Sequence, residues 1–89
     1  VIMGMSLAMS SEITFAKGRV QQSNFHDFEV LRFADQPQTI RTHLVGGGMD
    51  VPIGGVGEPP LPAVAPALAN AIFAATGKRV RSLPIRQVI

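Results

Sequence analysis

The stretch Gly54-Gly55-Val56-Gly57-Glu58-Pro59-Pro60 places one carboxylate between a glycine-rich loop and an alanine-rich helical pattern. Glycine lets a backbone approach a ligand closely, and proline restricts the residue before it to extended conformations. We therefore expect Glu58 to be held in an extended conformation at a loop-to-helix junction, which suits a fixed general base. The residue types also allow a simpler interpretation: a flexible turn, with Glu58 favouring the positive end of the helix dipole.

The alanine-rich pattern predicts a helix over Leu61–Thr76. Leu68, Ile72 and Ala75 form one apolar stripe, and the many alanines allow close approach to another element. Gly77 suits the position that follows a helix C-terminus. Pro66 is compatible with a helix that starts near Ala65.

The rest of the chain predicts short elements around a hairpin, so the fold class is α+β. Residues 2–11 have helical periodicity, in which Gly4 is unfavourable. Alternation predicts a hairpin from 12–15 and 19–22, with Gly18 at positive φ in the turn. The remaining expectations are a further strand at 39–45, a short strand or turn at 29–32, and an extended segment at 79–85.

Composition limits the classes of function. The 89 residues form at most one small domain, and only 16% of them are charged against 46% hydrophobic. Apolar surface should therefore be exposed unless a missing remainder, a partner or self-association covers it. A net charge of +2 without Trp or Tyr argues against nucleic-acid binding. The absence of Cys excludes disulfides and iron–sulfur ligation by this chain, and no apolar run has transmembrane length.

Other polar residues suggest structural roles. His26 and His43 lack zinc-ligand spacing, so no metal site is predicted. Asn24, His26 and Asp27 are expected to orient a loop by bonds to the backbone. Ser23, His26 and Asp27 include the residue types of a catalytic triad, but no Gly-x-Ser-x-Gly motif is present to support that role. The glycine loop matches neither the P-loop nor the dinucleotide-binding motif.

Two blocks of sequence resemble a known family. Residues 54–85, from Gly54-Gly55-Val56-Gly57-Glu58-Pro59-Pro60 to Leu83-Pro84-Ile85, form one block. The other combines 12–15 (Glu-Ile-Thr-Phe), 18–20 (Gly-Arg-Val) and 22–28 (Gln-Ser-Asn-Phe-His-Asp-Phe). Together they resemble the C-terminal end of molybdenum hydroxylase large subunits. The nearest pattern is that of isoquinoline 1-oxidoreductase beta subunits, in the xanthine dehydrogenase and aldehyde oxidase superfamily.

The resemblance implies a role for each site residue. Glu58 occupies the position of the active-site base, and Gly55, Val56 and Gly57 would lie close to a molybdopterin cofactor of the cytosine dinucleotide form. The implied substrates are N-heterocycles or aldehydes, hydroxylated with oxygen from water. The implied partners are the rest of the catalytic subunit and a small iron–sulfur subunit.

The resemblance also implies that residues 1–89 are the incomplete C-terminal portion of a molybdopterin-binding catalytic domain. A chain that opens on Val1 without Met fits a fragment. Most cofactor loops of the family lie upstream, and Met3 stands where some members have glutamine. The isolated chain is therefore expected to be cofactor-free, inactive and self-associating. The alternative is a non-catalytic interaction or self-assembling fragment.

Overall fold

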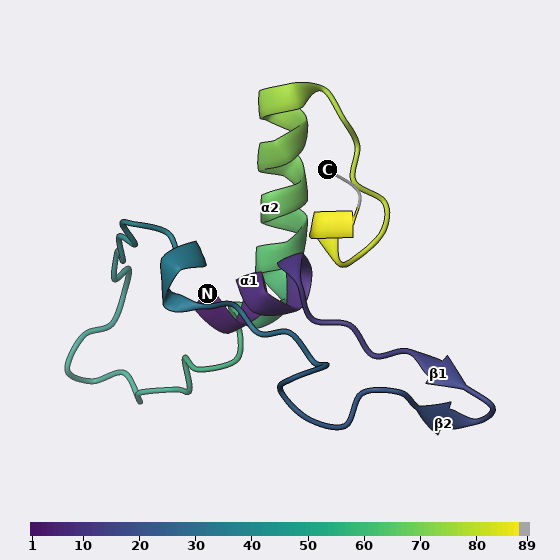
Figure 1. Ribbon diagram of the computed structural model, residues 1–89. Coiled ribbons are helices and arrows are strands. Elements are labelled where there is room, and N and C mark those ends of the chain that lie inside the picture. The colour runs from purple at the N-terminus through teal and green to yellow at the C-terminus, as the bar shows by residue number, and fades with distance from the viewer. Residues whose placement is uncertain (88–89) are drawn as a thin grey trace.

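Two helices meet at the centre of the structure, and a short hairpin and long loops extend from them (Figure 1). The computed structural model describes residues 1–87. Along the chain the elements are α1 (Ile2–Met9), β1 (Phe15–Ala16), β2 (Arg19–Val20), the 3₁₀ turn η1 (Phe33–Asp35), α2 (Leu61–Thr76) and the 3₁₀ turn η2 (Ile85–Gln87). The predicted α+β class is confirmed.

Small residues on α1 let it approach α2 closely. Gly4 and Ala8 are buried and lie one helical turn apart, whereas Met3 is 68% exposed. A Cβ built on Gly4 would lie 2.7 Å from Cγ2 of Val64 and 3.1 Å from the carbonyl oxygen of Leu61. The glycine that is unfavourable for helix propensity is therefore required by the packing of α1 on α2.

The C-terminal segment closes this small core. After α2 the chain runs back along the helix, and η2 contacts α1 (Figure 1). Ile85, the first residue of η2, is completely buried, and so is Ala8. The hydrophobic core therefore depends on α1, α2 and η2, whose sequence positions span almost the whole chain.

α2 has the predicted bounds and the predicted C-terminal glycine. Gly77 adopts a left-handed conformation with φ of 74°, and its N–H donates to the carbonyl of Phe73. Pro66 lies inside the helix, so the helix begins one turn earlier than Ala65. The guanidinium of Arg79 lies 3.5 Å from the centroid of the Phe73 ring, a cation–π contact that covers the end of the helix.

The hairpin has the predicted turn, but its strands are shorter than predicted. Phe15 pairs with Val20 and Ala16 pairs with Arg19 in an antiparallel register. The two-residue turn has φ of 50° at Lys17 and 72° at Gly18. Positive φ at both central positions matches the right-handed twist of paired strands, and Gly18 tolerates it without steric cost.

The predicted strand at 39–45 is wrong. These residues form no regular secondary structure, and all of them are exposed. Residues 29–32 form neither a strand nor a turn in the structure. A strand needs a neighbour to satisfy its N–H and C=O groups, and within residues 1–87 only β1 and β2 form a sheet. The β-propensity of residues 39–45 therefore does not produce a strand, because no neighbouring strand pairs with them.

The structure is far more open than a complete domain of this length. Its radius of gyration is 16.5 Å, against about 12 Å for a compact chain of this size. Its solvent-accessible surface is 7465 Å², roughly 2,400 Å² more than a folded monomer of this mass is expected to expose. Much of the surface that a complete domain would bury is thus uncovered.

Gly4→Ala tests the helix contact. A gain in helix propensity of about 1 kcal/mol opposes an overpacking cost of about 1–3 kcal/mol, so we expect net destabilisation. Val64→Ala should relieve the clash, making the double variant more stable than the sum of the two single effects. Urea unfolding followed by helical circular dichroism measures both.

Gly54→Ala is the matched control, because a Cβ there meets no atom within 4 Å and its φ is not in the left-handed region. Equal losses from Gly4→Ala and Gly54→Ala would contradict the packing role of Gly4.

Candidate functional site

Glu58 lies at the start of the turn that leads into α2. Its carbonyl oxygen accepts a hydrogen bond from the N–H of Leu61 at 2.9 Å, and the residue is exposed. The N-cap position belongs to Pro60, and no side chain caps the helix. The structure thus confirms the loop-to-helix position of Glu58 and gives its carboxylate no capping hydrogen bond.

The three residues before Glu58 are open to solvent. Gly55, Val56 and Gly57 are exposed, and Val56 is 82% exposed. A Cβ built on Gly55 or Gly57 meets no atom within 4 Å, and neither residue has positive φ. Nothing in the local structure therefore requires glycine at these two positions.

The described residues do not form a cradle for a large cofactor around Glu58. A Cβ built on Gly55 or Gly57 would meet no other atom within 4 Å, so the backbone there leaves room for a group to approach. Within these residues Glu58 also makes no side-chain hydrogen bond or ion pair with another candidate residue. A site at Glu58 would need surfaces from outside the described chain.

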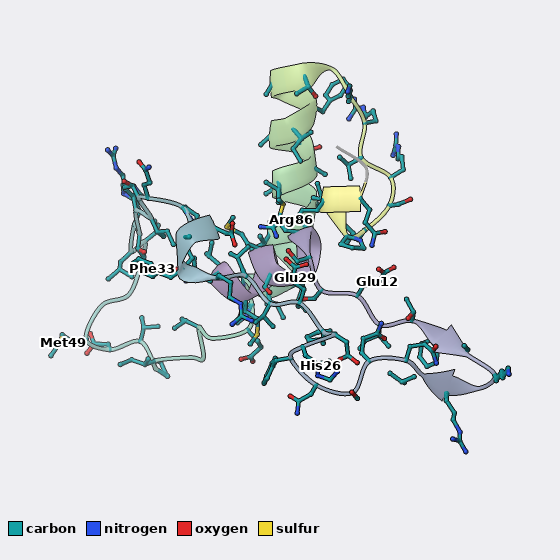
Figure 2. The ribbon with its side chains drawn as sticks, viewed as in Figure 1. Glu12, His26, Glu29, Phe33, Met49 and Arg86 are labelled. Carbon is teal, nitrogen blue, oxygen red and sulfur yellow. The ribbon has the colours of Figure 1, made fainter. Side chains whose placement is uncertain are left out.

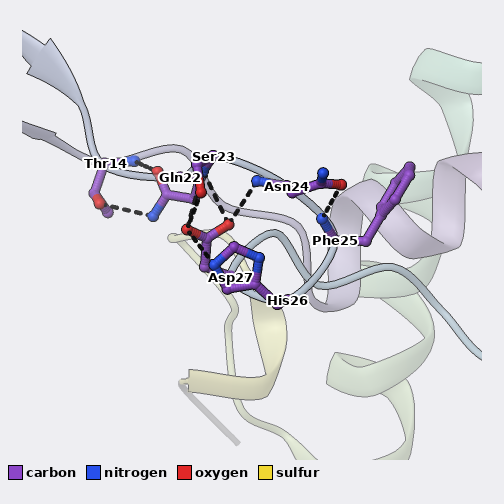
Figure 3. A network of polar contacts seen from close by, with 7 residues as sticks. All are labelled: Thr14, Gln22, Ser23, Asn24, Phe25, His26 and Asp27. Carbon is purple, nitrogen blue, oxygen red and sulfur yellow. Dashed lines mark hydrogen bonds and ion pairs between the residues drawn. The ribbon is translucent and has the colours of Figure 1, made fainter.

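The predicted loop network at 23–28 is present (Figure 3). The carboxylate of Asp27 accepts hydrogen bonds from the backbone N–H of Ser23 at 2.9 Å and of Asn24 at 2.9 Å. The side-chain oxygen of Asn24 accepts from the N–H of Phe25 at 2.8 Å. Asn24 and Asp27 thus orient this loop by side-chain-to-backbone bonds, as predicted, whereas His26 contacts the Asp27 carboxylate instead.

The arrangement in this loop differs from a catalytic triad. The hydroxyl of Ser23 donates to Asp27 at 3.1 Å rather than to His26. Nε2 of His26 lies 3.4 Å from the same carboxylate (Figure 3). The histidine therefore does not accept the Ser23 proton as it would in a Ser-His-Asp triad, which supports the structural role.

Hydrogen bonding lowers the pKa of Asp27. The backbone N–H groups of Asn24 and Ser23 stabilise the charged carboxylate, and the hydroxyl of Ser23 and the nearby His26 add to the effect. A lowered pKa means that the stabilisation is fully present above the unfolded-state pKa. It is lost as the pH falls through the folded-state value.

A side-chain pair extends the hairpin toward this loop. The N–H of Thr14 donates to Oε1 of Gln22 at 2.7 Å, and Nε2 of Gln22 donates to the hydroxyl of Thr14 at 2.9 Å. Backbone pairing continues with the N–H of Gln21 donating to the carbonyl of Thr14. The amide of Gln22 thus takes the place of a further backbone pair and connects the hairpin to the 23–28 loop.

An ionic cluster was missed by the sequence analysis. Arg86 contacts Glu29 at 2.7 Å and Asp35 at 3.3 Å, and Figure 2 shows Arg86 beside Glu29. Nearby, Nε2 of Gln87 donates to Glu12 at 2.7 Å. The partners lie 51 to 75 residues apart in sequence, so no local motif marks them. Their role is to hold η2 against the first half of the chain.

An apolar hollow beside α1 contains none of the predicted site residues. It has a volume of about 400 Å³ and lies between α1 and the 25–31 segment, with Met3, Leu7, Phe28 and Leu31 in its lining. No group of three or more His, Asp or Glu side chains among residues 1–87 is arranged to hold a metal ion. Over the same residues, no helix has the length and apolar character needed to cross a membrane.

The comparison with known proteins identifies what the chain resembles. Over all 89 residues it is 40% identical to the isoquinoline 1-oxidoreductase subunit beta of Brevundimonas diminuta. The predicted resemblance is confirmed. The chain is also 34% identical over 83 residues to a membrane-bound aldehyde dehydrogenase of Gluconacetobacter polyoxogenes that is named for pyrroloquinoline quinone.

These matches cover the chain and only a small part of each relative. They include 100% and 93% of the chain but 11% and 10% of the two relatives. The chain thus spans about a tenth of the length of the curated relatives it matches. No protein-family model and no solved structure matches it.

Asp27→Asn tests the loop network. The neutral amide weakens two charge-assisted hydrogen bonds, so the amide protons of Ser23 and Asn24 should exchange about fivefold faster at neutral pH. In the unchanged chain, NMR titration should place the pKa of Asp27 below its ordinary value of 3.8, with the loop loosening only under more acidic conditions. Asp50→Asn, at another exposed carboxylate, is the control. Unchanged exchange in Asp27→Asn would contradict the assignment.

Proposed function

We propose that this chain is one segment of a larger oxidoreductase that hydroxylates N-heterocycles or aldehydes with oxygen from water. The observation that supports it is the match of the whole chain to an isoquinoline 1-oxidoreductase subunit. The second relative is named as an aldehyde dehydrogenase, so both names describe oxidoreductases. In this proposal residues 1–89 are part of a molybdopterin-binding catalytic domain.

Glu58 is the proton acceptor in this proposal. A general base must have a free oxygen within hydrogen-bond reach of the proton that it removes. The carboxylate of Glu58 is exposed and caps no helix, so its oxygens are free to meet a nucleophile held by another surface. Pro59 and Pro60 behind it limit the backbone conformations of the junction.

The cofactor is assigned to the whole enzyme rather than to this chain. At Gly55 and Gly57 a Cβ would meet no other atom of the chain within 4 Å, so the walls around the cofactor are assigned to the rest of the enzyme. The proposed contribution of the chain is the open backbone of Gly55, Val56 and Gly57, beside which the cytosine dinucleotide form of the cofactor would lie. The name of the second relative specifies pyrroloquinoline quinone instead, an organic group that contains no metal. Metal analysis of the whole enzyme distinguishes the two cofactors.

Two protein partners follow from the same proposal. The rest of the catalytic subunit supplies the cofactor site and the pocket walls that select the substrate. In this proposal an iron–sulfur subunit carries electrons away, and these 89 residues contain no Cys to ligate a cluster. Nucleic acid is not a proposed partner, given the small net charge.

A non-catalytic, self-assembling fragment is the second candidate function. The observation that favours it is the large apolar side chains left exposed on several elements, such as Phe15 at 71% and Phe33 at 89%. Monomeric soluble proteins rarely expose large contiguous apolar patches. A coding sequence that continues into a cofactor-binding domain would favour the enzyme, and an isolated short reading frame would favour the fragment.

The 89-residue chain alone should contain no molybdenum and should self-associate. The described residues build no cofactor cradle, and the uncovered apolar surface favours association. Elemental analysis and sedimentation of the purified chain measure the two properties. Stoichiometric molybdenum, or a clean monomer at high concentration, would contradict the respective expectation.

Glu58→Gln in the whole enzyme tests the proposed base. Glutamine keeps the size of the side chain but cannot accept the proton, so turnover per bound cofactor should fall by about 10²–10⁴-fold while cofactor content is retained. Gly57→Val is the comparison, because a side chain added where the backbone faces the cofactor should lower cofactor content as well. Near-normal turnover per cofactor in Glu58→Gln would leave Glu58 as a residue of the helix junction only.

A further inference from the structure

Residues 44–56, here called the apolar arm, expose large apolar side chains almost completely. The exposed fractions are 95% for Leu44, 94% for Val45, 103% for Met49, 100% for Ile53 and 82% for Val56. Met49 points outward from the loop, far from the helices (Figure 2). Singly scattered apolar residues need no explanation, but five such side chains within 13 residues form one continuous exposed segment.

Contacts within the chain do not hold the apolar arm in place. Among residues 1–87 its backbone makes one hydrogen bond within itself, from the N–H of Val51 to the carbonyl of Gly48 at 3.1 Å. Gly46 and Gly47 both adopt positive φ, and a Cβ on either would meet no atom within 4 Å. The loop swings away from α1 and α2 before it returns to α2 (Figure 1).

We propose that the apolar arm docks on the rest of the catalytic subunit, and that this docking positions Glu58. The inference rests on the proposed function, since it needs the larger enzyme. Asp50 is the only charged residue among residues 44–56, so the complementary surface is apolar rather than a nucleic acid or a charged protein face.

The amount of uncovered surface favours the rest of the subunit over a second copy of this chain. The excess of roughly 2,400 Å² is about three times the 800 Å² that each partner buries in a standard interface. The relatives are about ten times longer than the chain, so enough additional polypeptide exists in a protein of this kind to cover such an area.

The link to Glu58 is short. Val56 lies two residues before Glu58, so their Cα atoms are at most about 7 Å apart. On the other side, α2 begins three residues after Glu58. Docking of Ile53 and Val56 on a fixed surface would therefore restrain the segment before Glu58, which contacts within the chain do not hold. Glu58 accepts the proton in the proposed reaction, and the docked apolar arm positions Glu58 without touching the reacting atoms.

Tryptic cleavage after Arg41 measures docking without using activity. Arg41 lies three residues before the apolar arm, and the next basic residue is Lys78, so cleavage between them is assigned to one bond. We expect cleavage in the whole enzyme to be at least about tenfold slower than in the 89-residue chain diluted until sedimentation shows it to be monomeric, because docking restrains the loop.

Paired substitutions in the whole enzyme separate apolar docking from other effects. Leu44→Ser and Ile53→Ser remove apolar contact and should raise the cleavage rate after Arg41 by about tenfold or more. Leu44→Met and Ile53→Leu keep the apolar surface and should leave the rate near that of the unchanged enzyme. Turnover per bound cofactor should fall in the serine variants and persist in the conservative ones.

Each result supports or overturns the inference. Equal cleavage in the whole enzyme and the 89-residue chain would overturn it, and so would serine variants that behave like their conservative partners. Protection that disappears when the enzyme is diluted to its monomer would assign the arm to a second copy and also overturn it. If Glu58→Gln retains turnover while the apolar arm remains protected, the base assignment fails and the docking stands.

Discussion

The approach of α1 to α2 at Gly4 is the contact on which the described structure depends. The two helices come close because position 4 has no side chain, which leaves room for Val64. Ile85 then buries itself completely next to this pair, and the ion pairs of Arg86 fix the returning segment to Glu29 and Asp35. The hairpin and the long loops carry little of this core, so their positions depend on a few polar contacts at their bases.

The parts of the fold that the sequence predicts are those determined by neighbouring residues. The bounds of α2 and the left-handed Gly77 follow from an apolar stripe and a helix-ending glycine. The hairpin turn follows from Gly18. The strand at 39–45 fails because a strand is stable only beside a partner, and this chain supplies none among its described residues. The pairing of Arg86 with Glu29, 57 residues away, leaves no trace in local sequence.

In the candidate site, too, local sequence predicts some features and not others. The position of Glu58 at the start of α2 is predictable, because glycines and prolines determine the local backbone. The chemical role of Glu58 is not determined by the described residues, because among residues 1–87 no ion pair involves its carboxylate. The 23–28 loop is the opposite case. Its polar groups satisfy one another, so its structural role is evident from the chain itself.

This contrast is the physical reason why we propose the glycine loop, and not the polar network, as the functional part. A segment that satisfies its own hydrogen bonds has little left to offer a ligand, whereas Gly55, Val56 and Gly57 expose backbone and side chain that no internal contact uses. Exposed apolar side chains raise the free energy of the isolated chain by leaving about 25 cal/mol per Å² of apolar surface uncompensated. The same term becomes favourable when a partner surface covers them. The exposed apolar side chains that destabilise the isolated chain are thus those that would contribute most to docking. They lie next in sequence to Glu58, the one carboxylate proposed as a general base.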